Sequence, residues 1–371
     1  MKHANLMTVL VAAIFVAGAC SSAATPAPTA APATAAPATA APSTAACDLT
    51  GKEVAWPLRG FDGYQQAQSA AFKAAAEADG VKVSIVNAKD DVTVQNKAID
   101  DWIAAGIDGI VLQPADPAAV AESTKKARAA GIPLVYVGTV PNPDTGAPKA
   151  PFVPFQDMME LTKNAGAEAA KYVKEKLGQT PKYVINDWVE IPVCHEERMV
   201  PFVDGIKSVA SDAVEVFWDT VPANKDQNMA KMEDQLQANP DFNIFTGCGG
   251  DLILGGVAGL QAAGRAKADN KVPKTEWILT IDGTPEEISL LLDPSTSVMA
   301  TIAQRPADNG VLIWKTLKAV MCGEMPVEGV PIEGIGSEYM TADWGCERIS
   351  EFYTAQYGLT EIYKPIDCSK Y

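Results

Sequence analysis

Two stretches in the last third of the chain decide its interpretation: residues 277–285 read WILTIDGTP and residues 297–306 read SVMATIAQRP. Each begins with an apolar run typical of a buried strand, and each ends in polar side chains, Asp282 in the first and Gln304 in the second. The amphipathic segment Pro285–Leu292 separates them. This order places Asp282 and Gln304 at the carboxyl ends of neighbouring strands, where open α/β sheets bind ligands. The alternative is that Asp282 only caps the helix that follows.

The composition excludes several classes of function. The chain has 371 residues, enough for two domains of about 100–200 residues each. Its formal charge of −16 argues against a nucleic-acid surface, because phosphate recognition needs clustered Lys and Arg. Of its two histidines, His3 lies at the start, so only His195 remains, which excludes a multi-histidine metal site. We expect no cofactor and no metal, and we interpret His195 as a loop residue without a chemical role.

The first twenty residues have the organisation of an export signal. A basic start that includes Lys2 precedes the apolar run Leu6–Ala19, which is short for a transmembrane span. The end of this run, VAGAC, resembles the lipobox of bacterial lipoproteins, in which the cysteine is acylated and becomes the mature N-terminus. Ala17 stands where that motif usually has leucine. We expect a lipoprotein signal peptide over residues 1–20, with Cys20 as the lipidated cysteine.

Residues 21–46 contain only Ala, Ser, Thr and Pro. Such a segment has nothing to bury and cannot offset the entropy lost on ordering. Its prolines favour an extended spacer of about 3 Å per residue. The composition therefore predicts a linker that tethers a folded domain to a lipid anchor, and the alternative is a leader that is removed.

Six cysteines remain after Cys20 is assigned to lipidation. An even number in an exported chain indicates disulfides, with buried free thiols as the alternative. No two of them have the C-x-x-C spacing of metal ligands. The six are Cys47, Cys194, Cys248, Cys322, Cys346 and Cys368.

From Lys52 onward, strand-like runs alternate with helical patterns. This alternation predicts right-handed βαβ units and parallel sheets. Two successive sets predict two doubly wound lobes, with the change near Gln156 and Asp157. The expected strands cover residues 81–87, 107–112, 133–137, 183–185, 214–218, 242–245, 277–281 and 297–303. The expected helices cover residues 92–105, 117–130, 158–177, 196–209, 226–238, 251–263 and 285–292.

Neither common phosphate-binding motif is present. No Gly-x-Gly-x-x-Gly follows the first strand, so a dinucleotide site is poorly supported. The glycine-rich turn at residues 247–251 lacks the Lys and Ser/Thr of a Walker loop. Its glycines favour a tight turn, with close approach of a ligand to the backbone as the alternative.

The order of these motifs is similar to that of the type I periplasmic binding proteins of ABC transporters. It most resembles the ribose-binding-protein-like group that takes simple sugars. The resemblance covers nearly all of residues 52–334. It is carried by VLQPAD at 111–116 and by the pair DGTP at 282–285 and ATIAQ at 300–304.

The resemblance implies an α/β fold of two doubly wound parallel-sheet lobes, joined by a three-crossing hinge with the ligand cleft between them. The second crossing is expected near residues 156–157 and the third near Gln304. The N-terminal lobe would comprise residues 47–156 and 305–333. The C-terminal lobe and tail would comprise residues 157–304 and 334–371.

The resemblance also implies which residues bind the ligand. Asp282 matches a carboxylate that accepts hydrogen bonds from sugar hydroxyls, Gln304 matches the hinge amide beside it, and Gln113 matches a polar residue at a strand end. A polyol needs such convergent polar groups and an aromatic face for its C–H surface. Further candidates in the first loop and the second lobe are Arg59, Asp62, Tyr64, Gln65, Trp188, Arg198 and Asp251.

Three departures from the ribose-type pattern lie at the expected pocket. Gly138-Thr139 stand where those proteins carry an Asp-Arg pair, and Arg198 is out of register with the arginine that usually precedes Gly205. Gly249-Gly250-Asp251 replace a common Asn-Asp turn. The ligand therefore stays open among pentoses, hexoses, cyclitols and the furanosyl signalling molecules that relatives bind.

Placing the cysteines on this fold implies a disulfide pairing. The helix that ends at Cys322 would run to the outer edge of the first lobe, near the point where Cys47 enters. Cys194 and Cys248 would each follow a second-lobe strand on the cleft side, and the other two cysteines lie in the tail. The expected pairs are Cys47–Cys322, Cys194–Cys248 and Cys346–Cys368.

These features predict an extracytoplasmic, lipid-anchored solute-binding protein that is not an enzyme. It would capture a simple sugar or polyol by hinge closure, as a monomer, and deliver it to an ABC permease with its ATPase. It would contact the membrane only through its lipid anchor and would bind no nucleic acid. Alternatives are a sensor that presents the closed form to a membrane receptor, a binder of a non-sugar ligand such as a nucleoside, and an enzyme that uses Asp282 or Glu196 and Glu197.

Overall fold

A computed structural model describes residues 47–155, 157–222, 224–330 and 332–371. Over this range the chain forms one compact unit with two α/β lobes. The first lobe has a five-stranded sheet in the order β2-β1-β3-β4-β5, and the second has a six-stranded sheet in the order β13-β12-β11-β8-β6-β7. The expected two-lobed α/β fold is confirmed.

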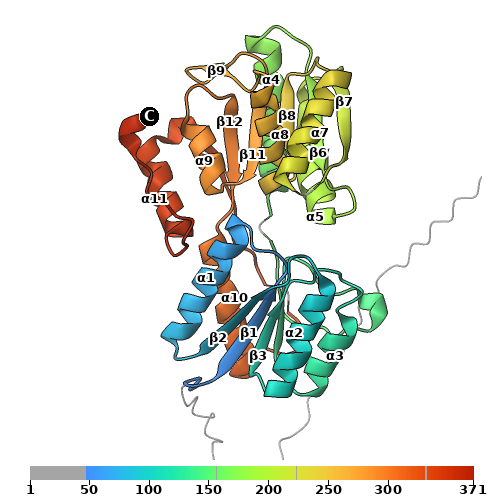
Figure 1. The fold of residues 1–371 in the computed structure, drawn as a ribbon, viewed down its shortest axis with the longest axis vertical. Helices are drawn as coiled ribbons and strands as arrows, with labels where there is room; N and C mark the ends of the chain where they lie inside the picture. Colours follow the sequence, from blue (N-terminus) through green and yellow to red (C-terminus); the bar gives the residue numbers. More distant parts are fainter. Residues whose placement is uncertain (1–46, 156, 223, 331) are drawn as a thin grey trace, which may run out of the picture. The chain divides into compact units, whose positions relative to one another are not determined.

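In the first lobe every strand pair is parallel. Along β1 the side chains alternate: Val54, Trp56 and Leu58 join the core under α1 and α10, whereas Ala55 joins the core under α2 and α3. Figure 1 shows α2 and α3 side by side, with α1 and α10 together. The elements are β1 (Glu53–Leu58), α1 (Gly63–Ala78), β2 (Lys82–Asn87), α2 (Val92–Ala105), β3 (Gly109–Leu112), α3 (Ala121–Ala129), β4 (Leu134–Val137), the 3-10 helix Pro143–Thr145, β5 (Phe152–Val153) and α10 (Pro306–Met321).

The second lobe has one continuous core around its larger sheet. Its helices α4 and α6 approach closely, since a Cβ on Gly166 would lie 1.9 Å from the Phe202 carbonyl oxygen. The elements are α4 (Met159–Lys176), β6 (Lys182–Asp187), α5 (Pro192–Cys194), the π-helical turn His195–Met199, α6 (Val200–Val209), β7 (Val214–Thr220), α7 (Lys225–Ala238), β8 (Ile244–Gly247), α8 (Gly250–Ala262), β9 (Ala268–Asp269), β10 (Val272–Pro273), β11 (Trp277–Asp282), α9 (Pro285–Leu292) and β12 (Val298–Ala303).

One strand at the edge of the second sheet departs from the parallel arrangement. Strand β13 (Glu338–Thr341) pairs with β12 in the antiparallel direction. This strand follows α10 of the first lobe, so it reaches the second sheet from the other lobe and not through a crossover helix of its own lobe. Helix α3 also starts later than expected, at Ala121, because Asp116 accepts the N–H groups of Ala118 and Ala119 and forms a separate turn.

The chain changes lobe three times. It passes from β5 to α4, from β12 to α10 at Arg305, and from α10 back to β13. The crossings expected near residues 156–157 and near Gln304 are therefore the first and the second in chain order. The third crossing follows α10. Gln156, at the first crossing, lies outside the described residues, and the exact lobe boundaries stay a prediction.

The tail contacts both lobes, although it was expected with the second. Helix α11 (Cys346–Tyr357) places Ile349 in the second-lobe core, whereas Tyr353 and Tyr357 pack against Ala67 of α1. Gln356 adds two polar contacts to α10: its Oε1 accepts the N–H of Ala307 at 3.1 Å, and its Nε2 donates to the Asp308 carboxylate at 2.9 Å. Figure 1 shows α11 beside α9.

Three disulfides have the same pairs that the sequence analysis expected. They join Cys47 to Cys322, Cys194 to Cys248 and Cys346 to Cys368, with Cα–Cα distances of 5.7, 5.0 and 5.6 Å. Their presence in the folded protein stays a prediction for chemical mapping. Within the described ranges, no helix has both the length and the apolar character needed to cross a bilayer. The expected signal peptide, Cys20 and the linker lie outside those ranges.

Candidate ligand-binding site

A cavity of about 640 Å³ lies between residues of the two lobes, at the carboxyl ends of their strands. All ten residues expected to bind the ligand line it. From the first lobe and the hinge come Arg59, Asp62, Tyr64, Gln65, Gln113 and Gln304, and from the second lobe come Trp188, Arg198, Asp251 and Asp282. The fold therefore brings the whole expected set together, and the binding role of each residue stays a prediction.

Asp282 is at the centre of the second-lobe wall. It ends β11 with a φ of 111°, a backbone conformation that is rare outside glycine. Gln304 Nε2 and Arg198 Nη1 both approach Asp282 Oδ1, the arginine at 3.5 Å. The helix-cap interpretation of Asp282 is wrong, because Thr284 is the N-cap of α9 and its N–H donates to Glu287 at 2.7 Å.

The surroundings of Asp282 perturb its ionisation. Burial raises its pKa to about 6, and the negative charge of Asp62 acts in the same direction. The Arg198 guanidinium, the Gln304 amide and the Gly250 N–H favour the carboxylate and limit the rise in pKa. At neutral pH the site therefore holds a buried, ionised hydrogen-bond acceptor that a ligand hydroxyl can satisfy.

Arg198 reaches this carboxylate because it lies in a π-helical turn, His195–Met199. A π turn accommodates an extra residue and rotates the following side chains relative to an α-helix. The π turn thus lets Arg198 face Asp282 although its position in the sequence differs from that of the arginine in ribose-type proteins. Arg198 is 6 % exposed, and its Nη1 donates to the Cys248 carbonyl at 2.5 Å.

The glycine-rich turn between β8 and α8 makes room for this ion pair. A Cβ on Gly249 would lie 2.7 Å from Asp282 Oδ2 and 3.0 Å from Arg198 Nη1, and the φ of Gly249 is +147°. The same turn contains Cys248, whose disulfide with Cys194 lines the cavity. The sequence predicted this turn. It did not predict that Gly249 leaves space for the side chains of Asp282 and Arg198.

Aromatic rings line both sides of the cavity. Tyr64 lies at the start of α1, and the Arg59 guanidinium lies 5.3 Å from the centroid of the Trp188 ring. Phe155, which the sequence analysis missed, packs edge-on against Tyr64 with ring centroids 6.2 Å apart. Gly138 admits it, because a Cβ there would lie 2.2 Å from the Phe155 ring. Gly138 stands where ribose-type proteins carry an aspartate. This glycine was the only sign in the sequence that the ring of Phe155 would line the cavity.

Amide groups form the first-lobe wall. Gln65 Nε2 donates to Gln113 Oε1 at 3.4 Å, and Gln95 Nε2 donates to the Gln113 carbonyl at 2.8 Å. Asp62 caps α1, since its Oδ1 accepts the Gln65 N–H at 2.8 Å. Asp62 therefore has a structural role in addition to its place in the cavity.

Two further carboxylates in the lining were not expected from the sequence. Asp90 pairs with Arg59 at 2.6 Å, and Glu286 pairs with Lys225 at 2.5 Å. Asp90 lies just beyond the end of β2, and Glu286 lies just beyond the end of β11. Their positions after strand ends were the signal by which the sequence could have identified them as lining residues.

His195 lies outside the cavity lining. Its Nδ1 is 2.6 Å from Asp187 Oδ2, which also accepts the indole N–H of Trp218 at 2.6 Å. These contacts anchor the loop that carries Trp188. Among the described residues, no cluster of three or more His, Cys, Asp or Glu side chains is arranged to hold a metal ion.

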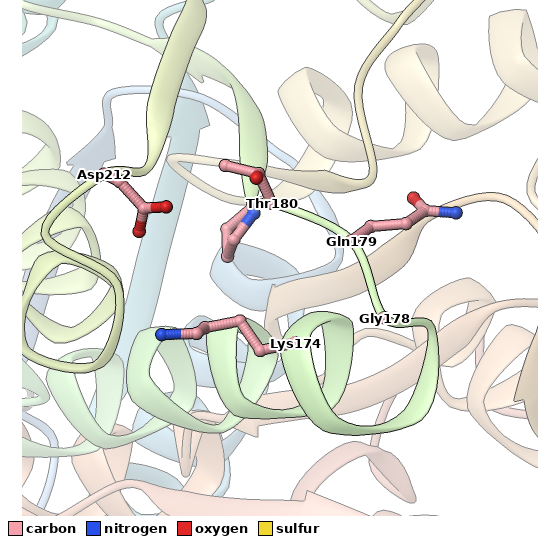
Figure 2. A pocket seen from close by; sticks show the side chains of 6 residues that line it. Lys174, Gly178, Gln179, Thr180 and Asp212 are labelled. Atoms are coloured by element: carbon pink, nitrogen blue, oxygen red, sulfur yellow. The ribbon is translucent and has the colours of Figure 1, made fainter.

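A smaller hollow of about 280 Å³ lies in the second lobe, beside the segment that leads into β6. It is lined by Lys174, Gly178, Gln179, Thr180, Pro181 and Asp212 (Figure 2). Lys174 Nζ already donates to the Val209 carbonyl at 3.0 Å, and the Gln179 amide accepts from Asn243 at 3.1 Å. Two of its polar side chains are thus engaged within the protein.

Comparison with known families agrees with the two-lobed architecture. Residues 53–325 match the model of a family described as the periplasmic binding protein domain. The chain belongs to this family. It is a family of extracytoplasmic sugar-binding proteins of ABC transporters, and its members are not enzymes.

Individual relatives are similar over much of the chain. The ribose import binding protein of Bacillus subtilis is 24% identical over 251 residues, which are 67% of this chain and 74% of that protein. A putative rhizopine-binding protein of Rhizobium meliloti is 29% identical over 190 residues, which are 51% of this chain and 60% of that protein.

Solved structures share the fold. A solute-binding protein of Bacillus halodurans with bound myo-inositol has a TM-score of 0.62 at 18% identity, and the match covers 84% of this chain and 99% of that one. A protein of Mycobacterium smegmatis in complex with β-D-fucofuranose has a TM-score of 0.64 at 20% identity, with coverage of 82% and 97%. These likenesses confirm a type I periplasmic binding protein fold.

Proposed function

We propose that this protein is an extracytoplasmic binding lipoprotein that captures a simple sugar or related polyol and delivers it to the permease of an ABC importer. The observation that supports this function is the convergence of Asp282, Gln304 and Arg198 with aromatic rings in one cavity between two lobes. Planar polar groups can bind hydroxyls in several directions, and rings can cover a C–H face. Named relatives and structural neighbours that bind ribose, myo-inositol and β-D-fucofuranose support the same ligand class.

The mechanism we propose is hinge closure. A ligand stabilises the closed form because only that form offers contacts from both lobes at once. Tyr64, Phe155 and Gln113 act from the first lobe, and Asp282, Arg198 and Trp188 act from the second. The permease then recognises the closed form.

We also propose that Cys20 anchors the protein to the membrane through lipid and that residues 21–46 form the tether. The lipobox-like VAGAC motif and the composition of the linker support this. In cells fed a labelled fatty acid, the protein should become labelled and its Cys20→Ser variant should not. Equal labelling of both would contradict the anchor.

The ligand can be identified directly from the full chain. Mass spectrometry of small molecules released by denaturing freshly purified protein, followed by thermal-shift screening of pentoses, hexoses and cyclitols, should identify a polyol. Stabilisation by a nucleoside or an amino acid, with no effect of any polyol, would contradict the proposed ligand class.

Asp282→Asn tests the site. The variant keeps the size of the side chain but removes the charged acceptor, so affinity for the identified polyol should fall by about tenfold or more. Asp144→Asn, at an exposed 3-10 helix of the first lobe outside the cavity lining, is the matched control and should bind normally. Isothermal titration calorimetry measures both, and unchanged affinity in Asp282→Asn would remove this residue from the site.

A further inference from the structure

The tail, residues 334–371, is built into the second lobe. Strand β13 pairs with β12, and Ile349 of α11 lies in the second-lobe core. The disulfide Cys346–Cys368 joins the start of α11 to the end of the tail. The match to the family model ends at residue 325, so the tail lies beyond it. Any movement of the second lobe relative to the first therefore carries the tail with it.

The same tail packs on α1 of the first lobe. Tyr353 and Tyr357, which are 2 % and 0 % exposed, form one buried cluster with Ala67. Because this cluster removes aromatic surface from water, separating the two tyrosines from α1 costs free energy. The contact therefore favours arrangements in which α1 stays beside the tail.

A second contact with α1 lies beside the cavity. A Cβ on Gly63, the first residue of α1, would lie 3.3 Å from Ile362 Cδ1 in the tail. It would also lie 3.9 Å from Thr284 Cγ2 and 4.0 Å from Pro285 Cδ, at the start of α9 in the second lobe. Gly63, Thr284 and Pro285 all line the cavity. The tail therefore meets both lobes at the cavity wall.

The tail also caps α10, the helix that follows the crossing at Arg305. The first N–H groups of a helix have no partner within it, and Arg305, the N-cap, has only donors on its side chain and cannot accept them. Gln356 takes this role from α11: its Oε1 accepts the N–H of Ala307 at 3.1 Å and that of Asp308 at 3.5 Å. Its Nε2 donates to the Asp308 carboxylate at 2.9 Å. Gln356 therefore fixes the start of α10, which follows closely on Gln304.

We propose that the tail is a strap that limits how far the lobes open when no ligand is bound, with Gln356 as the residue that positions the crossing between β12 and α10. The tail is fixed to the second lobe and contacts the first at α1 and at the start of α10. Wider opening would separate these contacts, expose the tyrosine rings and take the partner from the Ala307 N–H. The strap acts on the ligand-free protein, so this inference goes beyond the proposed function and holds whichever ligand the cavity takes.

A strap of this kind raises affinity without contacting the ligand. Only the closed form offers contacts from both lobes, and the apparent affinity falls with the fraction of the protein that can reach this form readily. By limiting wide opening, the strap increases that fraction. Its contribution is therefore measured on the lobes themselves and needs no ligand.

The first test measures the separation of the lobes in the ligand-free full chain. Spin labels on unnatural amino acids replace Val94 and Val189, which are both 40 % exposed and lie after the carboxyl ends of β2 and β6 in different lobes. Such labels add no cysteine, and double electron–electron resonance gives the distribution of the distance between them. Gln356→Met removes the cap and keeps the length of the side chain. Ile362→Ala shortens the side chain beside Gly63.

Both variants should broaden the distribution and shift it to longer distances than in the wild-type protein, and the double variant should shift it furthest. Thr354→Val is the matched control, because Thr354 is exposed on α11 and its Oγ1 bonds within the tail, to the Tyr363 hydroxyl at 2.8 Å. It should keep the wild-type distribution. Circular dichroism checks that each variant is folded. Wild-type distances in folded Gln356→Met and Ile362→Ala would overturn the strap, and shorter distances would overturn it too, because the tail would then hold the lobes apart.

The second test separates the positioning role of Gln356 from a general loss of stability. In Gln356→Met the Ala307 amide should exchange its hydrogen about tenfold faster than in the wild-type protein, the effect expected from loss of a helix cap. The Thr93 amide, which Asp91 caps at 2.7 Å on α2, should keep its rate. Equal acceleration at both amides, or none at Ala307, would overturn the positioning role.

Discussion

Two opposing sets of interactions act on the ionisation of the Asp282 carboxylate. Together they determine how the site responds to pH. Burial and the charge of Asp62 disfavour its ionised form, whereas Arg198, Gln304 and the Gly250 N–H favour it. Glu287, five residues further along the chain, has its pKa raised by burial and by the negative charge of Asp282. Both acids are therefore harder to ionise in the folded protein than in the unfolded chain.

We expect the contribution of Asp282 to the stability of the ligand-free protein to decrease as pH rises from about 4 to about 6. The pKa of Asp282 is 3.8 before folding and about 6 in the folded protein, so the folded state holds more protons in this window. The stabilising contribution is present below the lower value and is lost as pH rises through the upper one. Urea unfolding at a series of pH values measures how the free energy of unfolding changes with pH. Its decrease with rising pH should be smaller in Asp282→Asn than in the wild-type protein.

The control for this change with pH is Asp144→Asn, which removes an exposed carboxylate outside the cavity. It should keep the wild-type dependence on pH. If Asp282→Asn also kept that dependence, the perturbed group would be another acid and not Asp282.

At the scale of elements, the second-lobe wall depends on a covalent tie between two segments. The Cys194–Cys248 disulfide joins the segment that carries Trp188 and Arg198 to the turn between β8 and α8. That turn supplies the carbonyl to which Arg198 donates, and Gly249, which leaves room for Asp282. The disulfide therefore holds the arginine in register with its carboxylate.

We expect the double variant Cys194→Ser/Cys248→Ser to lose ligand affinity by about tenfold, because Arg198 is no longer held against the cavity. Titration calorimetry with the identified ligand measures this, and thermal denaturation measures the accompanying loss of stability. Removal of a native disulfide costs about 2–5 kcal/mol in stability.

The matched control is Cys47→Ser/Cys322→Ser. That pair closes a longer loop, with a sequence separation of 275 against 54, and lies outside the cavity lining. It should lose at least as much stability and keep its affinity. Equal affinities in the two double variants would show that the Cys194–Cys248 bond does not position the site.

At the scale of the whole molecule, the cross-links leave the hinge free. Cys47–Cys322 lies within the first lobe, Cys194–Cys248 within the second, and Cys346–Cys368 within the tail. The tail itself contacts the second lobe through Ile349 and the first lobe through Tyr357 and Gln356, and these contacts are non-covalent. Such an arrangement stabilises each lobe and still permits closure on a ligand.

We expect peptide mapping under non-reducing conditions to recover these three pairs from the full chain. Mass spectrometry of proteolytic fragments before and after reduction identifies them. A pair that joined Cys47 or Cys322 to a cysteine of the second lobe would contradict both the pairing and a freely moving hinge. Free thiols at all six positions would show that the disulfides do not form.

The amino-acid sequence by itself determined the alternation of strands and helices, and with it the two parallel sheets. It also determined which polar residues end strands, because periodicity and strand ends are local properties of the chain. Strand ends therefore placed Asp282 and Gln304 at the ligand-binding edge of a sheet, with a helix cap as the alternative for Asp282, and the resemblance to type I periplasmic binding proteins added Gln113. Only the tertiary structure decided what depends on contacts between distant segments. Phe155 enters the cavity because Gly138 leaves it space, Arg198 faces Asp282 because a π turn rotates it, and the tail reaches the first lobe because Tyr357 packs against Ala67.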